Sequence, residues 1–446
     1  MKRIISPLIF ILMLFALTSC GGKEKLLFLN WGEYIDDTMI SAFEEKYNCI
    51  VLMDLSESNE NFYSKVRTGT TVYDVVCPSD YMVEKMYRND MLAEIDFSKI
   101  KSYSKNENLK KGVQKIMTQM QEDCDEDITN YFVPYLWGTW GIMYSTEKEG
   151  LEEVVTGSTN EWECLFNRDA LPNDTRIAMY DSHQHAYYAA CQYLGDAFPY
   201  NEELPQSKLN KIKSLIKNVS YDAWGADNIK KDIVAGNLDL GFMWTGDFLY
   251  YYCEEAASTV MEAYLNKDIE YTEFKTMLDI ILSDERIYKA NNKEYSIGFD
   301  LYIPESTIAF CDNLVITKDA SNKDLAHKFI DFMSSYNETY IKNEVEVNVS
   351  PSYSNAYYVC YDTPFVSVYN DIVGMADTNF TADSVEGFDN SSNPYDSDLY
   401  WSFYDYAIGV AFIKYYSLDL TKGSILTSLD RSYIDIINTT LNNARV

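Results

Sequence analysis

The chain has 446 residues and a formal net charge of −32. Its length exceeds that of one ordinary domain and is typical of two lobes of roughly 200 residues each. Most of the charge is expected to form a solvated surface, but nucleic acids and anionic membranes are poor partners for so acidic a body, whereas a cationic solute would be attracted to it.

The first 19 residues are predicted to be an export signal. Two basic residues, Lys2 and Arg3, precede an apolar run over residues 4–17 that is too short to span a membrane. The run ends in Leu17-Thr18-Ser19-Cys20, which resembles a bacterial lipobox. The resemblance implies cleavage before Cys20, lipidation of its thiol, and a short tether over residues 20–25.

Eight further cysteines lie singly along the chain, without a C-x-x-C pair. A zinc ribbon or a dithiol redox site is therefore unsupported. An even number of cysteines in an extracytoplasmic protein is compatible with disulfides. The apolar runs around several of these cysteines instead favour buried free thiols. The sequence leaves the pairing open.

The first predicted strand ends on a cluster of aromatic and acidic residues. Four apolar residues, 26–29, lead into Asn30-Trp31-Gly32-Glu33-Tyr34, where Asn and Gly favour a turn. Open α/β sheets bind ligands at the carboxyl ends of their strands. A Trp and a Tyr that flank a Glu suit an organic cation, since ring faces attract positive charge and the carboxylate accepts charged N–H donors. The alternative is an ordinary strand end whose rings only pack.

Strands and helices alternate over the next fifty residues. A helix capped by Asp36 or Asp37 is followed by a strand over 49–53, a helix over 57–66, a strand over 72–77 and a helix that Ser79-Asp80-Tyr81 opens. This alternation predicts a parallel sheet with right-handed crossovers. The segments at 31–34 and 79–81 would then meet at one edge of the sheet.

The middle of the chain is predicted to pass to a second lobe. Residues 101–127 are charged and weakly helical, and 131–138 resume an extended strand in which Gly138 suits a crossing point. A strand over 176–181, a helix over 185–194 and a strand over 238–244 follow, the last ending in Thr245-Gly246-Asp247. Residues 252–295 are predicted to be an inserted helical element.

The apolar run over 307–316 is predicted to be a buried strand, and it contains one acidic residue, Asp312. A carboxylate in so apolar a run is costly unless it has a partner, so we expect one. A core helix over 325–332, a turn at 350–352, a surface loop over 378–398 and closing helices complete the chain.

Six motifs, in this order, resemble the bacterial spermidine/putrescine-binding proteins, the solute receptors of polyamine ABC importers. They are Asn30-Trp31-Gly32-Glu33-Tyr34, Glu57-Ser58-Asn59-Glu60, Val76-Cys77-Pro78-Ser79-Asp80-Tyr81, Pro134-Tyr135-Leu136-Trp137-Gly138, Trp244-Thr245-Gly246-Asp247 and Phe310-Cys311-Asp312. The resemblance implies a two-lobed α/β periplasmic-binding-protein fold with the ligand between the lobes. Each lobe would contain a mostly parallel sheet, with residues 26–136 and 311–350 in lobe 1 and residues 137–310 and 351–446 in lobe 2.

The resemblance also implies roles for particular residues. Trp31 and Tyr34 would form ring walls, with Glu33 between them as an amine acceptor. Ser79 would supply a hydroxyl and Tyr81 a further ring. Trp244 and Phe310 would enclose the aliphatic stem, while Asp247 and Asp312 would hold the ammonium or an inner amine.

The sequence departs from the family pattern at three places, one of which is the insertion of roughly forty residues before Tyr295. Ser182 and His185 stand where the family often has acidic residues, so Asp181 or His185 are further candidates on that side. The late aromatic of the family corresponds to Val349 or Tyr353. The choice between putrescine and spermidine stays open.

The resemblance implies a protein without catalytic residues, metal or cofactor that acts as a monomer. Its partners would be a polyamine, the permease subunits of an ABC importer, and the membrane through Cys20, with an extracytoplasmic location. The same fold with another solute, such as an amino acid, a choline-like cation or a sugar, is one alternative. A lipoprotein enzyme is another, but His183 and His185 face different sides of a helix, and the chain has no G-x-S-x-G or H-E-x-x-H motif.

Overall fold

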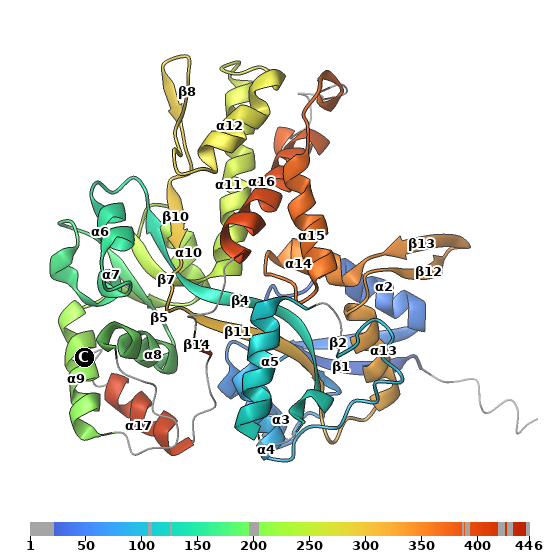
Figure 1. The fold of residues 1–446 in the computed structure, drawn as a ribbon. Helices are drawn as coiled ribbons and strands as arrows, with labels where there is room; N and C mark the ends of the chain where they lie inside the picture. Colours follow the sequence, from blue (N-terminus) through green and yellow to red (C-terminus); the bar gives the residue numbers. More distant parts are fainter. Residues whose placement is uncertain are drawn as a thin grey trace, which may run out of the picture.

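A mixed sheet runs through the whole molecule in the computed structural model, which describes residues 22–105, 109–124, 127–195, 205–385, 388, 393–417, 424–425 and 431–442. The strand order is β2-β1-β3-β11-β4-β7-β5-β6, with β10 paired to β4 and β14 to β11 (Figure 1). The strands are β1 (Glu24–Asn30), β2 (Cys49–Leu55), β3 (Val75–Val76), β4 (Phe132–Ser145), β5 (Ile177–Tyr180), β6 (Ala223–Gly225), β7 (Leu240–Trp244), β10 (Phe299–Tyr302), β11 (Ile308–Ile316) and β14 (Ser424–Ile425).

The two ends of the sheet are parallel and its middle is antiparallel. Strand β1 pairs in parallel with β2 and β3, and β5 pairs in parallel with β6 and β7. The long strand β4 pairs antiparallel with β11 along its first half and with β7 and β10 along its second half. The predicted α/β class is thus confirmed, and β4 joins the two halves of the sheet. The predicted strand at 131–138 continues without a break beyond Gly138.

Helices cover both halves of the sheet and extend above it (Figure 1). They are α2 (Asp37–Tyr47), α3 (Asn59–Thr68), α4 (Asp80–Arg88), α5 (Lys111–Cys124), α6 (Leu151–Gly157), α7 (Glu163–Phe166), α8 (His183–Leu194), α9 (Gln206–Val219), α10 (Asp227–Val234), α11 (Thr245–Leu265), α12 (Phe274–Ile281), α13 (Lys323–Met333), α14 (Pro351–Val359), α15 (Val366–Gly374), α16 (Asp398–Tyr416) and α17 (Arg431–Asn442).

Local signals explain several helix boundaries. The carboxylate of Asp36 accepts from the Thr38 amide and caps α2, which ends at Asn48 in the left-handed conformation. Ser58 caps α3 in the same way, and Ser182 caps α8. These caps fix where the strands and loops before each helix stop, and therefore where the residues at those strand ends lie.

The predicted insertion at 252–295 is only partly helical, so that prediction was wrong in part. Helix α11 begins earlier, at Thr245, and α12 follows it, but β8 (Tyr288–Ala290) and β9 (Lys293–Tyr295) form a hairpin. Asn291 and Asn292 both have positive φ at its tip, which favours a tight hairpin turn. In Figure 1 this hairpin and α12 project above the sheet. A second hairpin pairs β12 (Glu338–Lys342) with β13 (Val345–Val349).

The predicted turn at 350–352 was also wrong, because Pro351 begins α14. A proline is well accommodated in the first helical turn, where its missing N–H is not needed. The predicted signal at residues 1–19 and the lipidation site Cys20 lie outside the residues described. Among the residues that are described, no helix has the length and apolar character needed to cross a membrane.

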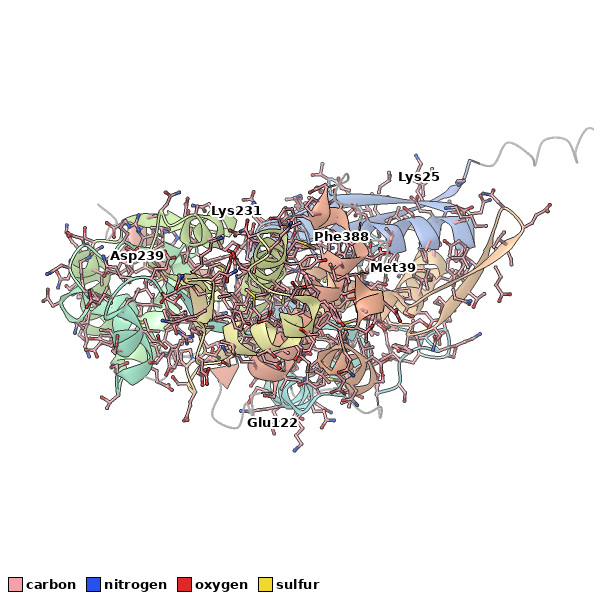
Figure 2. All side chains as sticks on the ribbon, turned by 90° about the horizontal axis from the view of Figure 1, so that it is seen from above. Lys25, Met39, Glu122, Lys231, Asp239 and Phe388 are labelled. Carbon is pink, nitrogen blue, oxygen red and sulfur yellow. The ribbon has the colours of Figure 1, made fainter. Side chains whose placement is uncertain are left out.

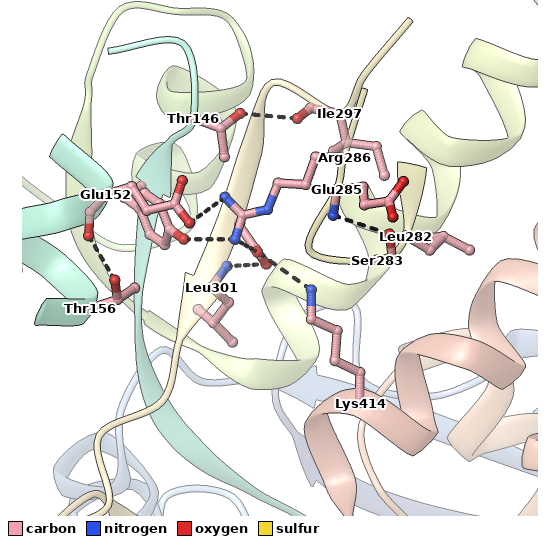
Figure 3. A network of polar contacts seen from close by, with 12 residues as sticks. Thr146, Glu152, Thr156, Leu282, Ser283, Glu285, Arg286, Ile297, Leu301 and Lys414 are labelled. Atoms are coloured by element: carbon pink, nitrogen blue, oxygen red, sulfur yellow. Dashed lines mark hydrogen bonds and ion pairs between the residues drawn. The ribbon is translucent and has the colours of Figure 1, made fainter. Parts of the chain in front are cut away.

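A network of charges connects the segment just before the β8–β9 hairpin with α6, β10 and α16 (Figure 3). Arg286 forms ion pairs with Glu152 at 2.9 Å and Asp300 at 2.8 Å, and it donates to the Tyr144 hydroxyl. Asp300 also accepts from Lys414 of α16. Other charged residues, such as Lys25, Glu122 and Lys231, are exposed at the rim of the molecule (Figure 2).

Candidate ligand-binding site

The carboxylate of Asp312 is the centre of a buried hydrogen-bond cluster in the middle of the sheet. The residue lies on β11 where the register with β4 shifts, and it is 4% exposed. Its two oxygens accept from the Ser79 hydroxyl at 2.6 Å and from the Tyr34 hydroxyl at 2.7 Å. Burial raises the pKa of Asp312 to about 6, although these two hydrogen bonds lower it. The expected partners therefore exist, but they are hydroxyls rather than a cation.

A second layer of hydrogen bonds holds the two hydroxyl donors. The Asn59 amide donates to the Ser79 hydroxyl at 3.0 Å and accepts from the Ser79 backbone N–H. The Tyr135 hydroxyl donates to the Tyr34 carbonyl at 3.2 Å. Both supporting residues belong to the six motifs, but no local pattern indicates which side chain each would contact. Ser79 and Tyr34 are thus fixed with their hydroxyls toward Asp312.

A second carboxyl, that of Asp80, is buried beside this cluster. It is fully buried and accepts from the backbone N–H groups of Tyr81, at 2.6 Å, and Cys311, at 3.2 Å. Burial raises the pKa of Asp80 to about 8, and the charge of Asp312 contributes to the increase. Asp312 therefore loses its proton first, and it is the carboxylate of the pair that is ionised at neutral pH.

A line of aromatic rings connects Asp312 with the other half of the sheet. The ring of Tyr34 lies 5.0 Å from that of Tyr361, Tyr361 lies 6.1 Å from Phe310, and Phe310 lies 4.7 Å from Trp244. All three contacts are edge-on, an arrangement that aromatic quadrupoles favour. Tyr361 was missed from the sequence, because it follows α14 and no strand signal precedes it.

The position of Tyr361 depends on Gly246. A side chain at Gly246 would collide with the Tyr361 ring, so the first turn of α11 and the ring approach closely only because no Cβ is present. The two residues expected to provide a late aromatic or apolar contact lie elsewhere: Val349 ends β13, and Tyr353 stacks on Tyr357.

The far end of the ring line is an aromatic enclosure around His185. The imidazole lies 5.1 Å from the Trp140 ring, 5.3 Å from Trp244 and 5.5 Å from Tyr180. Burial lowers the pKa of His185 to about 3, so the ring is neutral at physiological pH. The His185 Nδ1 and Trp140 Nε1 atoms are buried and have no hydrogen-bond partner in the parts of the chain that the structure describes.

The carboxylate of Asp247 is engaged by a cation of the chain itself. It forms an ion pair of 2.9 Å with Lys230, whose side chain is almost fully buried. Its charge is therefore compensated within the protein. This pair was not foreseen, because Lys230 belongs to α10 and was not among the candidates.

The remaining candidates lie around this core. The ring of Tyr81 is buried, and Trp31 is half-buried and packs edge-on against Phe62. Glu33 is exposed in a left-handed conformation with φ of 51°, and Asp181 is exposed after β5. The residues that hydrogen bonds and ring contacts bring together are therefore Tyr34, Ser79, Trp244, Phe310, Asp312 and His185.

Two further features bear on alternative sites. A cavity of about 210 Å³ near Tyr63, Arg67 and Lys318 contains none of the candidate residues in its lining. Within the described ranges, no group of three or more His, Cys, Asp or Glu side chains is arranged to hold a metal ion.

The eight cysteines after Cys20 are present as free thiols.

Comparison with known proteins agrees with this fold. Residues 1–191 match the model of a family described as hypothetical lipoprotein (MG045 family). The chain is 24% identical over 317 residues to the putrescine/cadaverine-binding protein of Pseudomonas aeruginosa, a match that covers 70% of this chain and 75% of that protein. It is 28% identical over 228 residues to the spermidine/putrescine-binding periplasmic protein of Escherichia coli, covering 50% of this chain and 59% of that protein.

The fold as a whole matches a solved substrate-binding protein. The spermidine/putrescine ABC transporter substrate-binding protein of Streptococcus pneumoniae superposes with a TM-score of 0.55 and 20% identity, covering 95% of this chain and 100% of that one. The chain therefore has the fold of a periplasmic binding protein. The resemblance to spermidine/putrescine-binding proteins that the six motifs indicated is confirmed by these relatives, whose names describe binding proteins rather than enzymes.

Proposed function

We propose that this protein is the extracytoplasmic solute-binding component of an ABC importer and that it captures polyamines such as putrescine or spermidine. The observation that carries the proposal is the ionisable Asp312, fixed by Ser79 and Tyr34 at one end of a line of aromatic rings. A carboxylate accepts the N–H donors of an ammonium group, and ring faces attract positive charge along an aliphatic chain. The names of the relatives support the same class of ligand.

The energies of such contacts are sufficient for a receptor. A charge-assisted hydrogen bond contributes about 1.5–3 kcal/mol, and a cation–π contact contributes about 0.5–2 kcal/mol. One carboxylate that accepts two hydrogen bonds, together with three or four rings, can therefore supply the roughly 8 kcal/mol of a micromolar complex after ordering costs. Capture and delivery need no catalytic group, so we propose that the protein is not an enzyme.

We also propose how the parts of the chain act. Lobe 1 would comprise residues 26–136 and 311–350, and lobe 2 residues 137–310 and 351–446, with β4 and β11 as the crossing segments. The lobes would close on the ligand as rigid bodies, and the permease subunits would recognise the closed form. Lipidated Cys20 would anchor the monomer to the membrane surface.

Calorimetric titration of the purified protein tests the proposed ligand class. Putrescine, spermidine, choline, an amino acid and a neutral sugar are titrated separately at about pH 7.5. We expect micromolar binding of the aliphatic amines and at least about tenfold weaker binding of the others, which is a difference of about 1.4 kcal/mol. No binding of any amine, or tighter binding of the sugar or amino acid, would contradict the proposal. Turnover of model esters or peptides would instead support an enzyme.

A further inference from the structure

We propose that the preferred solute is an aliphatic amine with one ammonium end and one neutral, oxygen-bearing end, of the class of mono-N-acylated diamines. This inference rests on the proposed function and specifies its substrate. It follows from the number of charges that the site has available and from the polar atoms at its far end.

Of the three carboxyls described beside the rings, Asp312, Asp247 and Asp80, that of Asp312 is the one ready for an ammonium group. Asp312 accepts from neutral hydroxyls, those of Ser79 and Tyr34. Asp247 is already paired with Lys230 at 2.9 Å. The carboxyl of Asp80 accepts from two backbone N–H groups, and burial raises its pKa to about 8, so it is mostly protonated at neutral pH. A second ammonium would therefore find no ionised, unpaired carboxylate among these three, and its burial without such a partner is unfavourable.

The far end of the ring line has the opposite chemistry. It is formed by Trp244, Trp140, Tyr180 and the neutral imidazole of His185, with ring centroids 5.1–5.8 Å apart. The fully buried indole N–H of Trp140 has no acceptor, and Nδ1 of His185 has no partner, among the residues described. An indole nitrogen can only donate a hydrogen bond.

An ammonium group cannot satisfy this donor, because it has three N–H donors and no acceptor. An amide carbonyl can accept from it, and a planar acyl group packs well against aromatic rings. The neutral imidazole also offers a complementary donor or acceptor to an amide. The chain of rings between the two ends suits the apolar methylene stem that connects them.

A comparison of the affinities of two ligands that differ only at one end tests the inference. Putrescine and N-acetylputrescine are titrated calorimetrically into the purified protein at about pH 7.5. We expect N-acetylputrescine to bind at least tenfold more tightly. Equal binding, or tighter binding of putrescine, would overturn the inference and leave the proposed function intact. Binding of neither amine would overturn both.

Two variants locate the preference in the enclosure around His185. Trp140→Phe keeps an aromatic ring and removes the N–H donor, so it should weaken N-acetylputrescine binding three- to tenfold more than it weakens putrescine binding. His185→Glu adds a carboxylate at the far end and should reverse the preference toward putrescine. His183→Glu adds the same charge in the same helical turn on another side of α8, and it should leave the ratio of the two affinities unchanged. Melting temperatures identify any variant that does not fold. The ratio of the two affinities measured on the unmodified protein does not depend on the variants and tests the inference without them.

Discussion

The carboxylate of Asp312 is expected to provide the main electrostatic contact with the ligand. In Asp312→Asn the shape and one acceptor remain while the negative charge is lost, so we predict an affinity for amines at least about 30-fold lower, or about 2 kcal/mol. Glu33→Gln removes the same charge from an exposed neighbour and should change the affinity less than about threefold, as is usual for a rim charge. Calorimetry on both variants measures this difference. A larger loss in Glu33→Gln than in Asp312→Asn would mean that the exposed carboxylate is the true anchor.

The pKa of Asp312 predicts how binding depends on pH. Burial raises this pKa to about 6, whereas an aliphatic ammonium stays charged to above about pH 9. The carboxylate must be ionised to hold the ammonium, so affinity should fall as the pH drops through about 6. Asp80, whose pKa burial raises to about 8, keeps its proton across this drop. His185, with a pKa of about 3, does not titrate in this window. Dissociation constants measured at intervals from about pH 5 to about pH 8 test this, and Asp312→Asn should abolish the dependence.

The same pKa has the opposite effect on folding stability. Because the folded state binds this proton more tightly than the unfolded state, the contribution of Asp312 to stability is complete below about pH 4 and is lost as the pH rises through about 6. Ligand affinity and the contribution of Asp312 to the stability of the free protein should thus change in opposite directions across one pH window. The binding prediction would be contradicted by an affinity that stays constant across that window.

At the scale of elements, the close contact between Gly246 of α11 and the Tyr361 ring predicts how a methyl group added at Gly246 changes stability. Gly246→Ala should destabilise the protein by about 1–3 kcal/mol, the usual cost of overpacking, and it should weaken ligand binding because the Tyr361 ring must move. Gly157→Ala is the matched control, since that glycine ends α6 and a Cβ there would have no heavy atom within 4 Å. It should be neutral or up to about 1 kcal/mol more stable. Urea unfolding measures both, and equal stabilities would show that the Tyr361 contact is not tight.

The charge network around Asp300 predicts how firmly the projecting hairpin is attached (Figure 3). Asp300→Asn would leave Arg286 and Lys414 without their shared, almost fully buried partner. Removal of one member of a buried ion pair typically costs about 3–5 kcal/mol, and because Arg286 keeps its ion pair with Glu152 we expect a loss at the lower end of this range. Glu294→Gln, which breaks the exposed pair with Lys289, should cost less than about 0.5 kcal/mol. Thermal unfolding compares the two, and similar losses would contradict a structural role for the network.

The elements themselves were mostly predictable because their signals are local. Asp36 begins α2 and Asn48 ends it, and the apolar runs that became β1, β7 and β11 alternate with the helices. The need of Asp312 for a partner was also readable from its apolar surroundings. Tyr361 and Lys230 were not predictable, since each reaches the site only through long-range packing. The β8–β9 hairpin was missed because its two strands are short and polar.

At the scale of the whole molecule, β4 is a continuous strand that belongs to both halves of the sheet. Its first half pairs with β11 and its second half with β7 and β10. Asp312 lies in the part of β11 that pairs with β4, whereas Tyr34 and Ser79 follow strands of one half and Trp244 ends a strand of the other. A ligand that touches all of these residues would connect the two halves, so its binding energy can stabilise one relative orientation of the halves.

Small-angle X-ray scattering tests whether this coupling produces closure. We predict that a saturating amine lowers the radius of gyration of the purified protein, since rigid halves that rotate about the crossing strands become more compact when they enclose a ligand. Asp312→Asn should show less compaction at the same ligand concentration, because it binds the amine more weakly and a smaller fraction of the protein is loaded. Glu33→Gln should close as the unmodified protein does. An unchanged scattering curve with ligand bound, as judged by calorimetry on the same sample, would mean that the two halves do not move and that the permease must recognise the loaded protein in some other way.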